Sequence, residues 1–450
     1  MGRSRTTRIE LGLAHASTLD TARVIMTVVL PLATRGVILR RPPVVALAER
    51  LDLDRRAVHL LQRLRARYGP GPLRLRVPGR SVALVLSPEG VQQVLSGSPE
   101  PFAVANREKR GALSHFQPHG VLVSHGQLRA DRRQVNEDVL DSHRPVHRLA
   151  EAIAAKVLEE ARPLLPDGSS RSLAWDEFAT TWWRAVRRVV LGDATRNDHE
   201  LTDLLAQLRA DANWSSLRPQ RTRVRARFLQ RLRAYLDEPE PGSLAELVAS
   251  TPSPAGTDPG GQVPQWLFAF DATGMATFRT LALLATHPAQ LDRVRSELAG
   301  KDLSGPQDLA VLRSCVQESV RLWPTTPAIL RDTTTDTTWD SRVLPAGTAL
   351  VIYAPYFHRD GQRLRYADQF TREIWLDGRA QHSWSLVPFS AGPAECAGRN
   401  LALLVATTLL AVLLEGHEFR LMSPASLDPR RPLPGTLNPF ALRFQVTPRK

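Results

Sequence analysis

Hydrophobic residues recur at intervals of three and four over most of the chain, which is the spacing of an amphipathic helix. A long apolar segment covers residues 266–284, and the run that starts at residue 398 is apolar on every side. Helices of this second kind are buried in globular proteins. The pattern therefore predicts a mainly α-helical chain. Helices are predicted at residues 57–68, 88–95, 127–140, 146–165, 175–191, 201–211, 221–236, 266–284, 288–298, 309–322 and from 398 onward.

Three regions have the shorter period of β-strands. Residues 73–86 alternate between apolar and polar on both sides of a Pro-Gly pair, which predicts a hairpin. Residues 328–353 contain short strand-like runs with a turn at 345–347, and the tail at 419–446 is also predicted to form strands. The protein is thus expected to be mainly α with a small β subdomain, split between the N-terminal part and the C-terminal third.

Two segments lack any periodicity. Residues 106–123 are rich in Gly, His and Ser and are predicted to form a long loop. Residues 239–262 are rich in Pro, Gly, Ser and Thr, so this linker or surface loop is expected to be the least ordered region. No internal repeat or clear boundary interrupts the rest. We therefore predict a single domain at 57–450, preceded by an extension at 1–56 that can form an amphipathic helix.

The chain has two cysteines, Cys315 and Cys396, which exclude a disulfide framework and a four-cysteine zinc site within it. Reduced thiols are the simpler interpretation, so we predict a cytoplasmic location. No signal peptide is evident, and the apolar run at 24–39 is shorter than the stretch of about 20 residues that spans a bilayer. We therefore expect no membrane partner.

The formal net charge is +14, which suits nucleic acid, an anionic membrane or an acidic protein as a partner. The charges are nevertheless spread along the whole chain. The densest arginine segment, residues 218–233, lacks the interleaved aromatic residues that stack on bases. This segment is typical of the solvated face of a helix, and we predict no nucleic-acid partner.

Cys396 lies in the segment FSAGPAECAGRNLA, residues 389–402, in which a glycine-bearing loop runs directly into an apolar helix. Glycine lets the backbone pass close to a flat ligand, and free amide groups at a helix start stabilise a thiolate. A thiolate held in this way is a good axial ligand for haem iron. Taken alone, the same pattern also fits a buried cysteine in a glycine turn.

A second segment weakens that simpler interpretation. Glu318 and Arg321 are three residues apart on a predicted helix that ends before Pro324, so the carboxylate and the guanidinium share one face. Such a pair is usually a surface ion pair of small energetic weight. Here the pair is followed by the strand-like region, by the sequence His-Arg-Asp at 358–360 and then by the cysteine loop.

The order of these motifs resembles that of cytochromes P450, particularly the soluble bacterial members. Three motifs carry the resemblance: Glu318-x-x-Arg321, His-Arg-Asp at 358–360, and Phe389-x-x-Gly392-x-x-x-Cys396-x-Gly398. Their combination is very specific, and the resemblance covers residues 57–446. It implies the cytochrome P450 fold, with haem b (iron protoporphyrin IX) between the long central helix and the helix that follows the cysteine loop.

The resemblance implies a role for each residue of the cysteine loop. Cys396 would be the axial iron ligand, and Phe389 would pack near its sulfur. Gly392 and Gly398 would let the loop approach the haem. The glutamate–arginine pair would be buried and would brace this loop.

Three arginines are implied as haem-binding residues. Arg133 matches the helix arginine that binds a haem propionate, and Arg331 matches a second such arginine. Arg129 stands where the family has an aromatic residue or His, and it can substitute there. The alternative for Arg133 is a solvated helix arginine, because Arg129 and Arg132 are its neighbours. Ala394 replaces a usual basic residue, so one propionate contact is expected to be lost.

The central helix contains the implied catalytic residues. Residues 268–272 align with the family sequence Ala-Gly-x-acid-Thr, so Asp271 would be the acid of the proton-delivery pair. Ala272 replaces the usual threonine, and Thr273 follows one residue later. These departures leave iron ligation untouched, but they put ordinary threonine-assisted dioxygen activation in doubt.

The function implied by the resemblance is a monooxygenase that activates dioxygen to hydroxylate or epoxidise an apolar small molecule in secondary metabolism. The alternative is an atypical haem-thiolate enzyme that uses peroxide or runs an oxidative coupling or rearrangement, because Ala272 replaces the threonine. A third class, a catalytically silent haem sensor or a nucleic-acid-binding protein, has only the net charge in its favour.

No flavin or nicotinamide domain is recognisable, so the resemblance implies that electrons come from a separate protein. We expect a ferredoxin or flavodoxin and its NAD(P)H-dependent reductase. An acidic carrier would dock near Arg129, Arg132 and Arg399, and salt would weaken that contact. The pocket implied by the family is mostly apolar, which suits a terpenoid or polyketide.

Overall fold

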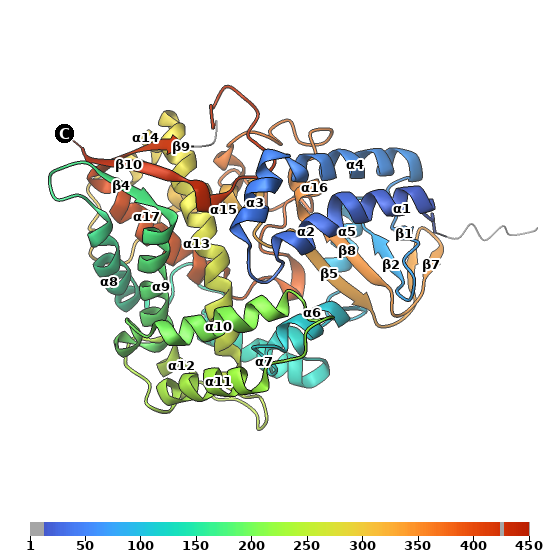
Figure 1. Ribbon diagram of the computed structural model, residues 1–450, viewed down its shortest axis with the longest axis horizontal. Helices are drawn as coiled ribbons and strands as arrows, with labels where there is room; N and C mark the ends of the chain where they lie inside the picture. Colours follow the sequence, from blue (N-terminus) through green and yellow to red (C-terminus); the bar gives the residue numbers. More distant parts are fainter. Residues whose placement is uncertain (1–12, 424–426, 450) are drawn as a thin grey trace, which may run out of the picture.

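The computed structural model describes residues 13–423 and 427–449. A 24-residue helix, α13 (Val263–Thr286), runs through the middle of the molecule (Figure 1). Its residues 274–284 are all buried, as expected for a helix that is apolar on every side. The helix predicted at 266–284 is therefore confirmed and is longer at both ends. Three helices pack against it: α9 (Trp175–Leu191), α15 (Ala310–Leu322) and α17 (Arg399–Glu415).

The stretch Pro259–Thr286 is long and apolar enough to cross a membrane by length and composition alone, but 72% of its most apolar window is buried inside the molecule. Further helices complete the large core around it. These helices begin and end within a few residues of the predicted bounds. They are α7 (Gly126–Val139), α8 (Ala150–Ala161), α10 (His199–Ala212), α11 (Thr222–Asp237) and α14 (Pro288–Leu298).

A five-stranded sheet, in the order β1-β2-β8-β5-β3, lies to the right of α13 in Figure 1. Within this sheet β2 and β8 pair in parallel, and the other neighbouring strands are antiparallel. The predicted hairpin at 73–86 is confirmed, because Leu73 pairs with Leu84. A second core joins this sheet to several helices. The elements are β1 (Leu73–Leu75), β2 (Val82–Leu84), β3 (Phe102–Ala103), β5 (Ala328–Thr333), β8 (Ala349–Tyr353), α4 (Leu53–Tyr68), α5 (Pro88–Ser96) and α16 (Ala354–His358).

Two smaller sheets contain the remaining strands. One has the order β4-β10-β9, with β4 (Arg171–Ala174), β10 (Arg443–Pro448) and β9 (His417–Ser423), and the other pairs β6 (Thr337–Trp339) with β7 (Arg342–Leu344). The expectation of strands throughout 419–446 is wrong for residues 427–442, which form loops and a short turn. Four prolines in that stretch remove the backbone donors that a strand needs.

Both predicted loops contain short helices. Residues 106–123 include α6 (Arg107–Leu113), which is capped by Asn106, whose side chain accepts from Lys109 N at 3.1 Å. Residues 239–262 include α12 (Leu244–Ser250), capped by Ser243. Ser and Asn at these caps are start signals that the Gly-rich and Pro-rich composition obscured.

The N-terminal helices pack into the same hydrophobic core as the five-stranded sheet. The predicted boundary between residues 56 and 57 falls inside α4. The helices α1 (Thr18–Val24) and α2 (Leu30–Arg35) continue into each other through a π-helical turn, and Val24 and Val28 are buried in the second core. The opposite face exposes apolar side chains, among them Leu19, Met26, Val29 and Leu30. The predicted fold class, mainly α with a small β part, is confirmed.

Candidate functional site

Cys396 is held in a tight loop between a 3-10 turn, Gly392–Ala394, and Gly398, the first residue before α17. The Cys396 N–H donates to Phe389 O at 2.9 Å, which closes the loop. Burial raises the pKa of the Cys396 thiol, and a hydrogen bond from Gly398 N–H lowers it again. An N–H directed at sulfur favours the thiolate, which is the form that binds metal ions.

Only one of the two predicted glycines is required by this loop. Gly392 has a φ of +68°, and a Cβ there would lie 2.4 Å from the carbonyl oxygen of Leu95 in α5. A larger residue would therefore displace the loop. At Gly398 an added Cβ would make an ordinary contact, 3.7 Å from Leu140. The structure thus explains Gly392 by its contact with α5, while the approach of both glycines to a haem stays a prediction.

The Cys396 side chain is exposed, although burial among protein atoms is the main influence on its pKa. These two facts agree if the thiol faces an open space inside the molecule. The middle of α13 has the same property, because Phe268, Ala269 and residues 271–273 are only half-buried on an otherwise buried helix. Both predicted faces of the site therefore border open space.

Glu318 and Arg321 form a fully buried ion pair at 2.7 Å, with both side chains 0% exposed. Arg321 also donates to the carbonyls of His358, Ala367 and Gln369. Glu318 accepts from Thr371 N and Trp375 Nε1 at 2.8 and 2.9 Å. The pair therefore fixes the segment 366–375 directly. It does not contact the cysteine loop, which corrects the expectation that it braces this loop itself.

His358 connects the buried pair to the cysteine loop. Its carbonyl accepts from Arg321, and its Nε2 accepts from Val387 N at 3.0 Å, two residues before Phe389. Burial, together with the charge of Arg321, lowers the pKa of His358 to about 3. The ring is therefore neutral and keeps a lone pair for the Val387 N–H, so the bracing runs through this histidine.

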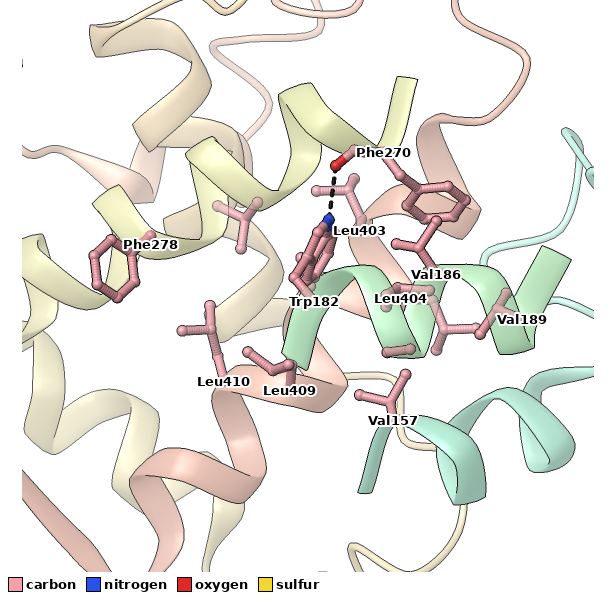
Figure 2. Packing of buried hydrophobic residues seen from close by; sticks show 14 of the residues in the cluster. Val157, Trp182, Val186, Val189, Phe270, Phe278, Leu403, Leu404, Leu409 and Leu410 are labelled. Atoms are coloured by element: carbon pink, nitrogen blue, oxygen red, sulfur yellow. Dashed lines mark hydrogen bonds between the residues drawn. The ribbon is translucent and has the colours of Figure 1, made fainter. Parts of the chain in front are cut away.

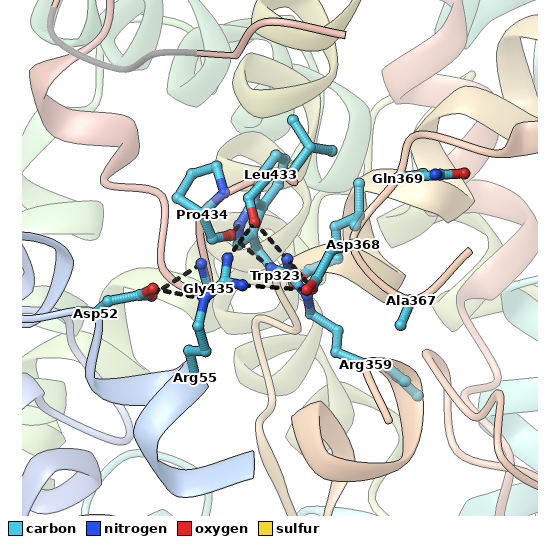
Figure 3. Close-up of polar contacts among 12 residues, drawn as sticks. Asp52, Arg55, Trp323, Arg359, Ala367, Asp368, Gln369, Leu433, Pro434 and Gly435 are labelled. Atoms are coloured by element: carbon cyan, nitrogen blue, oxygen red, sulfur yellow. Dashed lines mark hydrogen bonds and ion pairs between the residues drawn. The ribbon is translucent and has the colours of Figure 1, made fainter. Parts of the chain in front are cut away.

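A neighbouring network surrounds Arg359, the next residue (Figure 3). Arg359 binds Asp368 Oδ1 and the carbonyls of Leu433 and Pro434, and Arg55 from α4 binds the same Asp368 and Leu433. Every guanidinium in this group has a carboxylate partner. The network fixes the loop at 433–435 between α4 and the segment 366–375.

A second set of cations, buried or half-buried, has no carboxylate partner among the described residues. Arg331 donates from Nε to Ser98 Oγ at 2.8 Å and from Nη2 to Ser390 Oγ of the cysteine loop at 3.4 Å. Arg129 is buried, and its Nε has no partner among these residues. Burial lowers the pKa of Arg331 to about 10, and repulsion from Arg129 adds to this effect.

Lys109 of α6 is the third member of this set. Its Nζ donates to the carbonyls of Val104 and Leu330, each at 3.1 Å. Burial lowers the pKa of Lys109 well below its usual value, and repulsion from Arg331 and Arg129 contributes. Two nearby carboxylates oppose this shift, but neither lies within ion-pair distance in the described part of the chain.

Arg133 is already engaged elsewhere. Its Nε pairs with Glu137 at 2.5 Å, and its Nη1 donates to the carbonyl of Glu395 at 2.6 Å. The alternative of a solvated helix arginine is wrong, because Arg133 ties α7 to the cysteine loop. Its role in propionate binding stays a prediction, and the structure offers Arg129 and Arg331 as less committed groups.

On α13, Asp271 forms an ion pair with Arg209 of α10, which also donates to the carbonyl of Ile38. The Thr273 hydroxyl lies 3.4 Å from the carbonyl of Ala269, at the edge of hydrogen-bond distance. Ala272 offers no hydroxyl. The carboxylate and the alcohol predicted for proton delivery therefore have different environments, one tightly paired and one weakly bonded.

Trp182 of α9 lies directly against this part of α13 (Figure 2). Its Nε1 donates to the carbonyl of Phe270 at 2.9 Å, and a Cβ at Gly274 would come within 2.8 Å of the same nitrogen. Gly274 is therefore needed for the two helices to approach. The sequence carried a signal for this contact, since glycine inside an apolar helix often marks close packing.

Comparison with known proteins identifies the architecture. Residues 263–441 match the family model "Cytochrome P450". A zebra fish cytochrome P450, solved with abiraterone, superposes with a TM-score of 0.69 at 22% identity and covers 87% of this chain and 99% of its own. The chain therefore has the cytochrome P450 fold, and its residues 263–441 resemble that family in sequence.

Curated cytochromes P450 match about a third of the chain. Cytochrome P450 4c3 of Drosophila melanogaster is 30% identical over 159 residues, which cover 33% of this chain and 30% of that protein. Cytochrome P450 714C3 of Oryza sativa subsp. japonica is 30% identical over 162 residues, 33% and 31% of the two chains. The matched part thus spans about a third of the length of these relatives.

The P450 family implies a haem cofactor, and the residues present fit that group. Haem carries two carboxylates, and three cations that influence one another, the buried Arg129 and Arg331 and the half-buried Lys109, lack carboxylate partners in the described part of the chain. Burying an unpaired charge is costly, so such a set favours an anionic ligand. Arg331 also bonds Ser390 of the loop that presents Cys396. Cys396 would hold the iron, and the three cations would hold the propionates.

Lys109 was missed by sequence reasoning. It was assigned to a loop, and a lysine in a loop is normally solvated. Its contacts follow from tertiary packing, because one of the carbonyls it binds, that of Leu330, belongs to β5.

Proposed function

We propose that this protein is a haem-thiolate monooxygenase with haem b as its cofactor, acting on an apolar small molecule in secondary metabolism. It hydroxylates or epoxidises that molecule with dioxygen. The observation that carries the proposal is the Cys396 thiol, which faces open space at the start of α17 and receives the Gly398 N–H. A cysteine loop of this kind can supply a thiolate ligand to haem iron.

The bound haem supplies the reduction of dioxygen and the transfer of one oxygen atom to the substrate. The chain supplies everything else. Cys396 would hold the iron, and the Gly398 N–H favours its thiolate. Arg129, Arg331 and Lys109 would hold the propionates by charge-assisted hydrogen bonds. Buried helices around the site exclude bulk water.

Asp271 is the proposed acid of proton delivery. Its ion pair with Arg209 orients the carboxylate at the half-buried part of α13. Because Ala272 has no hydroxyl, the proton passes through Thr273, an ordered water or a hydroxyl of the substrate. The Thr273 hydroxyl is only weakly bonded to Ala269, so it can turn toward a new acceptor.

A second candidate rests on the same position. Without a threonine at 272, the site suits direct use of peroxide, oxidative coupling or rearrangement. The two candidates differ in the source of oxygen and electrons, so they can be separated by experiment.

Redox partners are needed by P450 monooxygenases, and we propose a ferredoxin or flavodoxin with its NAD(P)H-dependent reductase. Two of the three predicted docking residues are wrong, because Arg129 and Arg132 are buried. Arg132 donates to Thr257 O and Ser124 Oγ instead. Arg399 is half-buried and pairs with Glu395.

The absence of a nucleic-acid partner stays a prediction. The arginine-rich segment 218–233 supports it, since several of its guanidinium groups are already paired with acids of α10 and its cap. Arg218 and Arg221 bind Asp211, and Arg231 binds Asp198. Paired arginines attract phosphates less strongly than free ones.

The cytoplasmic location and the lack of a membrane contact also stay predictions. The exposed apolar face of α1 and α2 bears on them, because such a face can lie on a lipid surface.

Isotope labelling tests the proposal. Haem-loaded protein with a ferredoxin and reductase would be supplied with a panel of terpenoid and polyketide substrates under ¹⁸O₂. We expect products that carry one ¹⁸O atom. Turnover with hydrogen peroxide alone, and none with the electron-transfer chain, would replace the monooxygenase by the peroxide-driven candidate.

A further inference from the structure

A cavity lies beside the C-terminal half of α13, and its wall is apolar on most sides. Met275 and Arg279 of α13 line it, together with the residues that follow α15 and the loop before β10. Its apolar lining residues are Val45, Met275, Trp323, Pro324, Pro327, Pro355, Leu437, Pro439 and Phe440. Such a wall suits a hydrocarbon group.

Three arginines and one carboxylate are also part of this wall. Arg35 and Asp54 form a bidentate pair, with distances of 2.7 and 2.8 Å. Arg40 and Arg279 remain, and neither has a carboxylate within ion-pair distance in the described part of the chain. The lining therefore carries two guanidinium charges in excess.

Backbone carbonyls satisfy some of the donors of these two arginines. Arg279 donates to Leu437 O from Nε and Nη2, at 3.0 and 2.6 Å, and to Trp323 O at 3.2 Å. Arg40 donates to Gly36 O and, at 2.6 Å, to Thr325 O. A guanidinium has five N–H groups, so donors remain on both side chains. A carbonyl can satisfy a donor, but it does not neutralise the charge.

Burial and repulsion from other arginines lower the pKa of both Arg40 and Arg279. Burial lowers the pKa of Arg279 to about 9, and repulsion from Arg40 is the next cause. Burial likewise lowers the pKa of Arg40 to about 10, and Arg35 contributes. Arg40 is nevertheless half-buried, which is expected of a side chain that faces an internal cavity.

No nearby carboxylate in the described part of the chain forms an ion pair with Arg40 or Arg279. Asp271 is paired with Arg209, and Asp54 also accepts from Thr436. Glu49 accepts from Asn438 N and forms no ion pair with Arg40 or Arg279 among the described residues. An additional anion is therefore the partner that the two arginines lack.

We propose that Arg40 and Arg279 bind the carboxylate of the substrate, an apolar molecule with a single carboxylate group. This inference rests on the proposed function, since it assigns a substrate class to the same site. Met275 and Arg279 follow Ala272 by three and seven residues, so the three share one face of α13. Seven residues of helix span about 10 Å. The carboxylate is thus bound about 10 Å from the turn that contains Ala272, and oxidation occurs at a carbon remote from it.

The test is calorimetric binding to the haem-loaded protein with matched probes. Dodecanoate and 1-adamantaneacetate would be compared with their methyl esters, which have the same hydrocarbon but no charge. We expect each acid to bind roughly 10- to 100-fold more tightly than its ester, as for other charge-assisted hydrogen bonds. Equal affinities, or no binding of either acid up to its solubility, would overturn the proposal.

Two variants locate the effect. Arg40→Gln and Arg279→Gln should each remove most of the preference for the acid. Arg41→Gln is the matched control, because Arg41 stacks on Trp214 and does not line the cavity. It removes the same charge one residue away and should leave the preference unchanged. If Arg279→Gln fails to fold, Arg40→Gln decides, and a preference that survives in it overturns the proposal.

The absorption spectrum of the reduced, carbon monoxide-treated protein is recorded on the same samples. A thiolate-type band without any preference for acids means that the carboxylate site is wrong while the proposed function stands. Preference for acids without such a band means that the site stands and the proposed function fails.

Discussion

Arg321 and Arg129 are both buried arginines of the same protein, but their surroundings are opposite. Arg321 is fully buried, forms an ion pair with Glu318 and donates to several backbone carbonyls. Arg129 is also buried, yet its Nε has no partner among the described residues, and its closest charged influence is another arginine, Arg133. The chain itself supplies the carboxylate partner of Arg321, whereas Arg129 has no such partner in the described part of the chain.

This difference separates scaffold from ligand site. A buried ion pair with all its hydrogen bonds made holds segments of chain together, and nothing else is needed to satisfy it. A buried cation without a carboxylate is costly in the folded chain and becomes favourable when an anion arrives. The Glu318–Arg321 group belongs to the first class. Arg129, Arg331 and Lys109 belong to the second.

The largest effect should come from breaking the buried ion pair between Glu318 and Arg321. Glu318→Gln leaves the Arg321 charge uncompensated in a fully buried position, which we expect to cost about 3–5 kcal/mol of unfolding free energy. Urea unfolding monitored by circular dichroism measures it. Asp377→Asn, in the exposed pair with Arg379, is the control and should leave the unfolding midpoint unchanged. Similar midpoints for both variants would show that Glu318–Arg321 is not a scaffold.

The Asp271–Arg209 pair lies between the two classes, because it is paired but borders open space. Asp271→Asn keeps the size of the side chain and removes its proton-donating ability. We expect coupled turnover to fall roughly 100-fold, the size typical of general acid–base catalysis, with haem content unchanged. Product formed per NAD(P)H consumed is the measurement. Unchanged coupling would remove Asp271 from the proton path.

Removing the charge of Arg129 should change the stability of the haem-free protein in the opposite direction. Arg129→Gln removes an unpaired buried charge, so the haem-free protein should be at least as stable as wild type. Affinity for haem should fall roughly 10- to 100-fold through the loss of a propionate contact. Haem titration and urea unfolding of the haem-free protein measure the two quantities. A loss of haem-free stability equal to that of Glu318→Gln would abolish the distinction.

The effect that is smallest at neutral pH comes from His358, and it grows on acidification. Its folded-state pKa of about 3 lies below the usual value of 6.5, so the unfolded state binds more protons between these values. Stability from this source is present above pH 6.5 and is lost as the pH falls toward 3. His358→Gln should flatten the curve of unfolding free energy against pH between 6.5 and 4. An identical slope in the variant would mean that other groups cause it.

Long periodic segments and spaced motifs made much of this molecule predictable. The central helix and the helix after Cys396 follow from their uniform apolar composition, and the Glu318–Arg321 pair follows from its spacing of three residues. The partner of Arg133 was also within reach, since Glu137 follows at the i, i+4 spacing. These features depend on local sequence.

The features that sequence reasoning missed depend on contacts between distant segments. Lys109 binds the carbonyl of Leu330, which belongs to the distant strand β5. Arg40 reaches the carbonyl of Thr325, which is 285 residues away in the chain. Arg129 and Arg132 were expected at a docking surface, and tertiary packing buries both. Periodicity says which face of a helix is buried only when its residues are apolar.

The most direct test of the account is the absorption spectrum of the purified protein after reduction and exposure to carbon monoxide. The account predicts a red-shifted Soret band that is lost in Cys396→Ser, because only a thiolate ligand at this position produces it. A spectrum that is unchanged in Cys396→Ser, or no haem band after expression with a haem precursor, would contradict the assignment of Cys396 as the iron ligand.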